Sequence, residues 1–515
     1  MPTAAGAVRP YDELRNLLRE AATLGSVGHL LNWDQETYMP HAAAEHRAAQ
    51  QEAIAKLVHE RMTSKRIGEL IAACEADPGV VADPAGVEAA NLREIRRDYD
   101  RATKLPSDLV AELARTGSLA QEAWKAAREK SDFAQFEPWL DKMMALSRRK
   151  AQCLSAGAKF AEPYDALLDE YEPGATAREL EAIFNPLAAR LSGLIRELSR
   201  APGKPDDAFL HVQFAPSKQH EMGEFVLKAM GFDFASGRLD VTTHPFCSGM
   251  APGDTRLTTR YRDEKFTDAL YGSMHEGGHG LYEQGLPKVG AIARFGEPLA
   301  DSISLGIHES QSRMWENLVG RSREFWSWLL PHAKKFAGGP LDRFSVDDAF
   351  RATNIVSPSF IRVEADEATY NLHILLRFEI ERRLISGDLK VRDVPGEWNS
   401  RFKQLLGIDV PDDRRGCLQD VHWAFGLIAY FPTYTLGNLY AAQFWETIRQ
   451  QIPDLPAQMS RGEFGALKAW LNTNIHQHGR RFKAGDLCRQ LTGKPLSADP
   501  LMRHLETKFR AVYGL

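Results

Sequence analysis

Residues 266–284, FTDALYGSMHEGGHGLYEQ, are the stretch that decides the fold. Apolar residues recur in it three and four positions apart, which indicates a helix with one apolar face. His275 and His279 are four residues apart, so in a helix both side chains lie on one face, about 6 Å apart along the axis. Two imidazoles placed in this way can supply half of the coordination of a tetrahedral zinc ion. The stretch therefore predicts a helix that presents metal ligands.

Glu276 follows the first histidine and completes the pattern H-E-x-x-H. Its carboxylate lies at the edge of the same helix face, where it can act as a general base on a water molecule that the metal polarises. Gly277 and Gly278 cost this helix roughly 2 kcal/mol relative to two alanines. Because glycine lets another backbone or a substrate approach closely, we expect a close backbone contact with the helix at these two positions.

A catalytic zinc ion takes three protein ligands and leaves one position open, so a carboxylate should come from a second element. Residues 304–312, SLGIHESQS, lie in a helical pattern and offer Glu309, thirty residues after His279. Glu297 and Asp301 precede this segment and are alternative third ligands. Any one of these carboxylates could instead be a solvated side chain. An accidental H-E-x-x-H is expected in roughly a few of a hundred such chains, so the motif needs support from the rest of the sequence.

The rest of the 515 residues reads as mainly helical, and we expect one large domain over residues 1–515. Helical patterns fill an N-terminal half, residues 1–235. Between residues 236 and 265, the segments RLDVTTH and DTRLTTRY are rich in β-branched residues and flank the turn-rich PFCSGMAPG, which predicts a β-hairpin. Residues 266–515 return to helical patterns. The predicted fold class is therefore mainly α, with one small sheet just before the histidine helix.

Composition excludes several classes of function. The formal charge of −5 and the scattered lysines and arginines give no basic surface for nucleic acid. No stretch approaches 18 uncharged apolar residues, so no membrane span is expected. The first residues show no signal-peptide pattern, and the five cysteines are irregularly spaced without a C-x-x-C pair. We expect a cytoplasmic protein with reduced cysteines.

Taken together, the motifs resemble those of the carboxypeptidase Taq family of zinc metallocarboxypeptidases, within the gluzincin group. The matching segments occur in the family's order over about the full length of the chain. They are LLNWDQETYMP from Leu30 to Pro40, HPF from His244, D-x-R-x-T from Asp254, H-E-x-x-H from His275, HES from His308, IRVEAD from Ile361, GCLQDVHW from Gly416, and NIHQHG near the carboxyl terminus.

The resemblance implies that His275, His279 and Glu309 hold one zinc ion per chain and that Glu276 is the general base. Cobalt is expected to be able to replace zinc. The family's helical body is saddle-like with a deep central groove and usually forms a homodimer. Its members release single residues, with broad preference, from peptides that have a free carboxyl terminus. An endopeptidase or dipeptidase on the same scaffold, or an inactive zinc-binding peptide scaffold, are the alternative functions.

A carboxypeptidase must recognise a terminal carboxylate, and the planar fork of arginine is suited to this because it donates two parallel hydrogen bonds. With the resemblance, Arg362 is the first candidate for this role. Its alternative is an ordinary i,i+4 helix pair with Asp366. Arg256, on the second strand of the predicted hairpin, is a second candidate, because an edge strand beside the metal can pair with a substrate backbone.

Peptide hydrolysis also needs a donor for the oxyanion that forms at the scissile carbonyl. The segment DVHWAFGLIAYFPTY contains His422, Tyr430 and Tyr434. Related gluzincins use a histidine and a tyrosine from a comparable late segment, which implies this role for His422 and one of the two tyrosines. Either tyrosine could equally be a core aromatic with a satisfied hydroxyl group.

Overall fold

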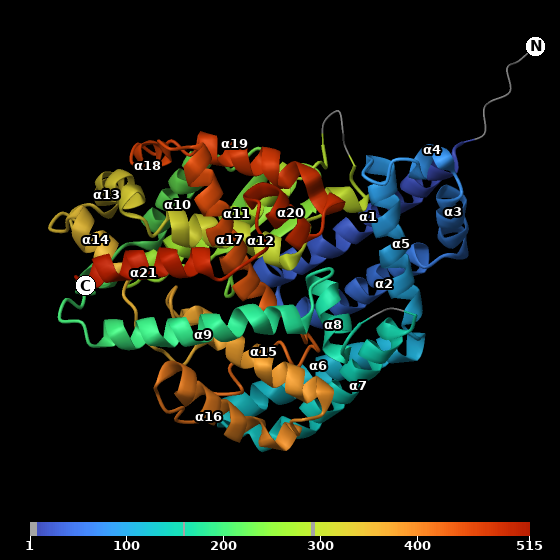
Figure 1. The fold of residues 1–515 in the computed structure, drawn as a ribbon, viewed down its shortest axis with the longest axis horizontal. Helices are drawn as coiled ribbons and strands as arrows, with labels where there is room; N and C mark the ends of the chain where they lie inside the picture. The colour runs from blue at the N-terminus through green and yellow to red at the C-terminus, as the bar shows by residue number, and fades with distance from the viewer. Residues whose placement is uncertain (1–7, 158–159, 290–293) are drawn as a thin grey trace, which may run out of the picture. The chain divides into compact units, whose positions relative to one another are not determined.

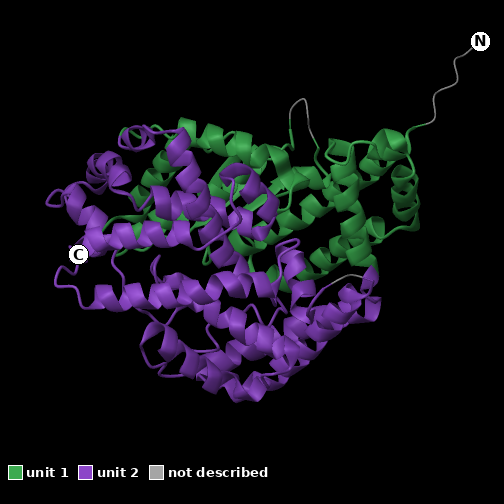
Figure 2. Ribbon diagram, in the orientation of Figure 1, with its two compact units in different colours: residues 1–103, 213–303, 461–483 green, residues 104–212, 304–460, 484–515 purple. Residues whose placement is uncertain are grey.

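The structure is a computed structural model and describes residues 8–157, 160–289 and 294–515. Helices make up most of it and there is one small sheet (Figure 1), so the predicted fold class is confirmed. The chain forms two compact units, each assembled from three separated segments (Figure 2). The first unit takes residues 1–103, 213–303 and 461–483, and the second takes residues 104–212, 304–460 and 484–515. None of the described helices is long and apolar enough to cross a membrane.

The first unit contains the sheet and the helix of the H-E-x-x-H motif. Its helices are α1 (Pro10–Thr37), α2 (Ala44–Met62), α3 (Lys65–Glu75), α4 (Pro78–Val81), α5 (Val87–Lys104), α10 (Pro216–Met230), α11 (Phe266–Gly285) and α19 (Gly465–Asn474). Its strands are β1 (Gly237–Val241), β2 (Cys247–Ala251) and β3 (Asp254–Thr259).

The sheet has three strands in the order β1-β3-β2, which corrects the predicted hairpin. The two β-branched segments do form β1 and β3, but they pair in parallel, with Arg238 opposite Arg256. The stretch read as a turn contains β2, which is antiparallel to β3 and shows a register shift between Gly249 and Ala251. Arg256 therefore lies on the central strand, not on an edge strand as predicted. Strand β2 is the edge strand that pairs antiparallel with β3.

Helix α11 packs against this sheet and against α10. Apolar side chains on several of its sides are buried, among them Phe266, Leu270, Met274 and Leu281. A helix that is buried on most sides belongs to the core of a protein, and its polar residues are then placed there for a reason other than solubility. The histidines and the glutamate of the motif are carried by this helix.

The second unit contains helices and no strand among the residues described. Its helices are α6 (Ser107–Lys130), α7 (Glu137–Ser155), α8 (Pro163–Tyr171), α9 (Ala177–Ser199), α12 (Leu305–Arg313), α13 (Arg323–Ala337), α14 (Val346–Ala352), α15 (Tyr370–Ser386), α16 (Val394–Leu406), α17 (Pro432–Gln451), α18 (Leu455–Met459), α20 (Ala484–Thr492) and α21 (Asp499–Tyr513). A π-helical turn, Met314–Val319, continues α12.

Three of these helices position the residues discussed below, and local chemistry sets their ends. Helix α12 starts at Ser304, whose side chain accepts a hydrogen bond from the amide of Ile307, as an N-cap should. Helix α17 starts at Pro432, where a missing N–H group costs nothing. Helix α15 ends at Gly387, which takes the left-handed conformation (φ 91°) that glycine adopts easily.

The segment between α16 and α17, residues 407–431, has turns but no helix or strand. The sequence predicted helical structure for most of it, and this prediction is wrong. Connections of this length inside a compact unit are uncommon and are usually functional. The segment carries two of the predicted site residues, His422 and Tyr430, and we refer to it as the 407–431 loop.

Candidate active site

His275 and His279 project from the same side of α11, as the four-residue spacing requires. Their ring centroids are 4.9 Å apart with ring planes at 84°, and both side chains are half-buried. Glu276 lies next to them with only 6% of its surface exposed. The helix thus offers two accessible imidazoles together with a carboxylate that is shielded from bulk water.

Two glycines explain how α11 packs so closely against α10 and the sheet. A Cβ atom at Gly277 would lie 2.4 Å from Leu227 Cδ2 of α10, and one at Gly280 would lie 2.7 Å from Leu257 Cδ2 of β3 and 2.8 Å from Phe232 Cε2. These distances are far below an ordinary carbon contact. A close contact is present at Gly277, but the neighbour is a side chain and not a backbone as expected. Gly280, which the sequence did not single out, lets the helix approach the sheet.

A buried carboxylate holds the start of α12, the helix that carries Glu309. Glu172 is 1% exposed, and its Oε2 accepts a hydrogen bond of 3.1 Å from the amide of Gly306. Its Oε1 accepts one of 3.2 Å from the hydroxyl of Tyr440, and Ser304 donates a further bond. Burial raises the pKa of Glu172 to about 7. The first turn of α12 is therefore tied to α17 through one side chain.

The Glu309 carboxylate is itself fixed by its own helix. Arg313 donates from Nε to Oε1 at 2.6 Å, and the hydroxyl of Ser312 donates to Oε2 at 3.1 Å. Gly437 of α17 lies directly against Glu309, because a Cβ atom there would come within 2.5 Å of its Cγ and 2.6 Å of its Cβ. The position of the carboxylate is thus set by α17 beneath it and by Arg313 beside it.

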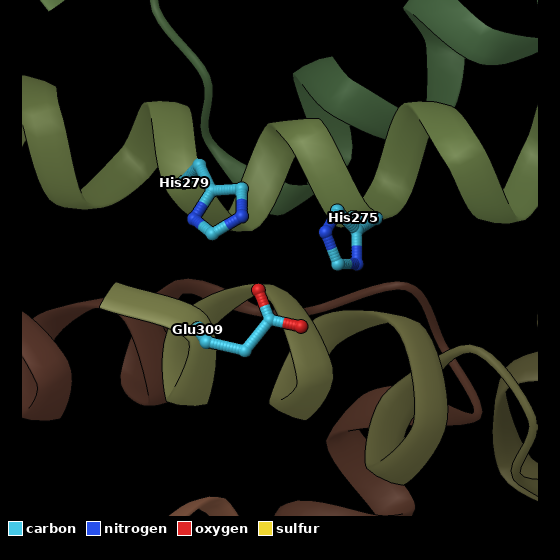
Figure 3. Close-up of side chains that lie close together, drawn as sticks. All are labelled: His275, His279 and Glu309. Atoms are coloured by element: carbon cyan, nitrogen blue, oxygen red, sulfur yellow. The ribbon is translucent and has the colours of Figure 1, made fainter. Parts of the chain in front are cut away.

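The structure brings His275, His279 and Glu309 together (Figure 3). One ligand atom from each lies within 4.8 Å of the others. Ligand atoms around a tetrahedral zinc ion are about 3.3 Å apart when each bond is about 2.0–2.1 Å, so small side-chain rotations would close this set. Two imidazole nitrogens and one carboxylate oxygen are donors that zinc prefers in catalytic sites. The residues present therefore fit a zinc ion with a position left open.

Of the three candidate third ligands, only Glu309 belongs to this group among the described residues. Glu297 is 1% exposed and is bound elsewhere: Arg15 donates to its Oε1 at 2.7 Å, and Arg294 lies 3.6 Å from its Oε2. Asp301 is exposed and lies outside the group. The geometry thus favours the choice that the resemblance implied.

His422, Tyr430 and Tyr434 lie together at the end of the 407–431 loop and the start of α17. The His422 ring centroid is 5.6 Å from that of Tyr430 and 6.5 Å from that of Tyr434, and the two tyrosine rings are 5.5 Å apart. Burial raises the pKa of both tyrosines, and the negative charge of Glu309 adds to this effect. Both hydroxyls thus keep their protons at neutral pH, and the structure leaves the choice between them open.

His422 stays neutral for physical reasons. Burial and the nearby positive charges of Arg362 and Arg377 together lower its pKa to about 4, although the negative charge of Asp420 opposes them. A neutral imidazole carries one N–H donor and one acceptor nitrogen. His422 can therefore donate a hydrogen bond at neutral pH without carrying a charge.

Arg362 is buried, with 6% of its surface exposed, and it does not form a helix pair with Asp366. Its Nε and Nη2 atoms donate to Oδ1 of Asp420 at 3.1 and 2.8 Å, and its Nη1 donates to the hydroxyl of Tyr370 at 3.0 Å. Asp366 instead accepts from the amides of Ala368 and other residues just before α15. Arg362 has two N–H groups beyond these bonds, so binding of a carboxylate by it stays a prediction.

Arg256 is held within the sheet. It donates from Nε and Nη2 to Asp254 at 2.9 Å each, and its guanidinium lies 4.2 Å from the ring centroid of Trp33 in α1. Thr258 bonds both the amide and the carbonyl of Phe246. The D-x-R-x-T and HPF motifs, and part of LLNWDQETYMP, thus form one connected structure. The role of Arg256 in substrate binding stays a prediction.

Sequence reasoning missed three buried charged residues that hold this region together, Glu172, Arg377 and Glu381, and gave no role to the half-buried Arg313. In the sequence, Arg377 and Glu381 look like a common i,i+4 pair on an exposed helix face. Only a charged residue within an apolar run, as in NLHILLRFEIE, could have indicated burial. The sequence shows that Arg313 lies four residues after Glu309, but it does not show that the two side chains are bonded.

The donor set and the shielded carboxylate beside it are those of a metal-dependent peptidase. Comparison with known proteins agrees and is more specific. Residues 13–509 match the family described as carboxypeptidase Taq (M32) metallopeptidase, and the chain belongs to this family. It is therefore a metallocarboxypeptidase, a peptide hydrolase.

The similarity extends over whole chains. A thermostable carboxypeptidase 1 from Thermus thermophilus is 44% identical over 510 residues, which cover 98% of this chain and 99% of that protein. Carboxypeptidase 1 from Bacillus subtilis is 37% identical, with 98% of each chain covered. The crystal structure of the M32 carboxypeptidase from Deinococcus radiodurans R1 superposes with a TM-score of 0.94 at 39% identity, covering 98% of this chain and 100% of that one. These comparisons give no support to an endopeptidase, a dipeptidase or an inactive scaffold.

Proposed function

We propose that this enzyme uses one zinc ion, held by His275, His279 and Glu309, to remove single residues from peptide carboxyl termini with broad preference. The observation that carries the proposal is that these three side chains place their ligand atoms within 4.8 Å of one another. Zinc bound there would supply Lewis acidity, which activates the attacking water and polarises the scissile carbonyl.

Glu276 is proposed as the general base. It takes a proton from the attacking water and delivers that proton to the leaving amine. Its position supports this role, because the carboxylate directly follows His275 on the same helix and is largely shielded from bulk water. A purely structural metal site would not require a carboxylate next to its histidine ligands.

His422, with Tyr430 or Tyr434, is proposed to donate hydrogen bonds to the oxyanion. Support comes from the physical state of these groups, since the imidazole stays neutral and both phenols stay protonated at neutral pH. Donors that are already oriented stabilise a developing charge without reorganisation.

Arg362 is proposed to bind the terminal carboxylate of the peptide, with Arg256 as the second candidate. Both guanidiniums are already fixed by a carboxylate, Asp420 and Asp254 respectively, and each keeps N–H groups beyond the bonds described. Asp420 also binds Arg377, so the two guanidiniums and the one carboxylate together keep a net positive charge that favours an anionic chain end.

The resemblance further supports a homodimer in which cobalt can replace zinc. Light scattering coupled to size exclusion would measure the mass of the assembly, and activity after removal and return of each metal would test cobalt. The cytoplasmic location predicted from the cysteines stays a prediction.

The decisive experiment is a timed mass-spectrometric digest of three peptides of one sequence: unblocked, acetylated at the amino end, and amidated at the carboxyl end. We expect stepwise loss of carboxyl-terminal residues from the first two only, abolished by a chelator and restored by zinc. Glu276→Gln should bind zinc as the wild type does and lose at least about a hundredfold in kcat. Cleavage of the amidated peptide, or full activity of Glu276→Gln, would contradict the proposal.

A further inference from the structure

Helix α15 carries a buried polar row that faces the 407–431 loop. Arg377 and Glu381 are both fully buried, and each bonds to this loop. Arg377 donates from Nε and Nη2 to Oδ2 of Asp420 at 2.8 and 2.5 Å. Helix α15 thus supplies fixed points to a loop that has no helix or strand of its own, in addition to those from α6 and its C-cap.

Glu381 makes the contacts nearest to the predicted catalytic residues. Its Oε1 accepts from the indole Nε1 of Trp423 at 2.8 Å, and its Oε2 accepts from the backbone amide of Ala429 at 3.1 Å. Trp423 directly follows His422 in the chain, and Ala429 directly precedes Tyr430. One carboxylate thus fixes the neighbours of both residues.

The bond from the Ala429 amide to Glu381 holds the backbone of Ala429 in an unfavourable conformation. Its φ of 69° places an L-residue other than glycine in the left-handed region, which is sterically disfavoured for such a residue. Such a conformation persists only where the surrounding structure enforces it, and this is found most often at functional sites. The bond from the Ala429 amide to Glu381 is the contact that can enforce it.

Stability alone does not explain a carboxylate in this place. Replacing buried charged groups by well-packed apolar side chains is often neutral or stabilising. Glu381 is surrounded by three donors, the third being the hydroxyl of Tyr164 at 2.9 Å, and burial raises its pKa to about 7. Two of the three groups that donate to Glu381, the Trp423 indole and the Ala429 amide, belong to the loop, so the carboxylate fixes loop geometry.

We infer that Glu381 is a positioning residue, which orients His422 and Tyr430 for the reaction by fixing Trp423 and Ala429 from α15. The inference rests on the proposed roles of His422 and Tyr430. If the inference is correct, replacing Glu381 should change the rate of the chemical step and should leave metal binding unchanged.

The chain offers a matched control in Glu172, a second buried carboxylate that accepts three hydrogen bonds and has a pKa raised to about 7. It holds the amide of Gly306, at the start of the helix that carries the proposed ligand Glu309. Glu172→Gln should therefore weaken zinc binding by about tenfold, with kcat restored at saturating zinc. Glu381→Gln should instead leave zinc binding unchanged and lower kcat even at saturating zinc.

The experiment measures kcat and KM on an acetylated peptide at saturating zinc, and zinc affinity by chelator competition, for both variants. Glu381→Gln turns an amide N–H group toward a donor, so we expect kcat to fall about 10- to 100-fold, KM to change less than about threefold, and zinc affinity to stay within about twofold. Adding Trp423→Phe removes the opposing donor and should recover part of the lost kcat. If Glu381→Gln fails to fold, Trp423→Phe alone, which deletes the loop side of the same bond, should lower kcat without changing zinc affinity.

Two outcomes would overturn the inference. One is a Glu381→Gln enzyme that unfolds more easily but keeps the wild-type kcat, and the other is a pair of glutamine variants that lose zinc affinity alike. His422→Gln separates this inference from the proposed function. If His422→Gln keeps full kcat, the proposed role of His422 is wrong, whereas a loss of kcat in His422→Gln but not in Glu381→Gln refutes only the positioning role.

Discussion

Replacing Gly437 by alanine should weaken metal binding through a single methyl group. The new Cβ atom would lie 2.5 Å from Cγ and 2.6 Å from Cβ of Glu309, and 3.0 Å from its carbonyl carbon. Carbon atoms in ordinary contact are about 3.5–4.0 Å apart, so α12 and α17 must separate by about 1 Å at the residue that supplies the proposed third ligand. Overpacking of this kind costs about 1–3 kcal/mol.

The helix propensity of alanine acts in the opposite direction. Alanine in a helix interior is favoured over glycine by about 1 kcal/mol, so the net loss of unfolding free energy for Gly437→Ala should be about 1 kcal/mol in the metal-free enzyme. Displacing a group that supports a metal ligand typically costs 10- to 100-fold in affinity, and we expect a loss of about tenfold here. Activity should return when zinc is raised above the new dissociation constant.

The assay is chelator competition for zinc affinity, with urea unfolding of the metal-free protein for stability. Gly193→Ala in α9 is the control, because its Cβ atom would meet nothing within 4 Å. That variant should gain up to about 1 kcal/mol and bind zinc as the wild type does. A Gly437→Ala enzyme with unchanged zinc affinity would refute the assignment of Glu309 to a position set by α17.

Three further predictions concern pH, strain and the metal. Because the pKa of His422 is about 4 in the fold and 6.5 ordinarily, only the unfolded state takes up a proton between these values, so stability should fall by up to about 3 kcal/mol as pH drops from 6.5 to 4. His422→Gln should flatten this part of the urea-unfolding profile; equal slopes would contradict it. Ala429→Gly should release backbone strain and raise the unfolding free energy by about 1 kcal/mol. Removing zinc present at 100 times its dissociation constant should cost about 2.7 kcal/mol, seen as a lower melting temperature in a chelator.

The histidine pair could be predicted because its geometry is local. Four residues along a helix bring two side chains to one face whatever surrounds them, so the arrangement of His275 and His279 follows from spacing alone. The third ligand required more, since three carboxylates fit the rule and the preference for Glu309 rested partly on the resemblance. The structure adds the physical reason, because Glu297 is already paired with Arg15.

The sheet and the 407–431 loop could not be predicted by the same means. The composition of β1 and β3 indicated strands correctly, but nothing in either segment encodes a parallel pairing, and β2 lies in a stretch whose proline and glycines resemble a turn. In the loop, apolar residues at helical spacing suggested helix. Their actual partners, such as Glu381 for Trp423, are about forty residues away in the chain, and periodicity contains no information on such contacts.

The second unit uses buried charge to attach its irregular parts to its helices. Glu172 fixes the start of α12, Arg377 binds Asp420, and Glu381 binds two points on the 407–431 loop. Each of these groups loses hydration on folding, which apolar replacements would avoid. Hydrogen bonds are directional and apolar contacts are not, so these groups define the position of a loop backbone more closely than apolar side chains could. Since oxyanion stabilisation depends on donors held at hydrogen-bonding distance, we propose that these buried charges serve the geometry of the reaction more than the stability of the fold.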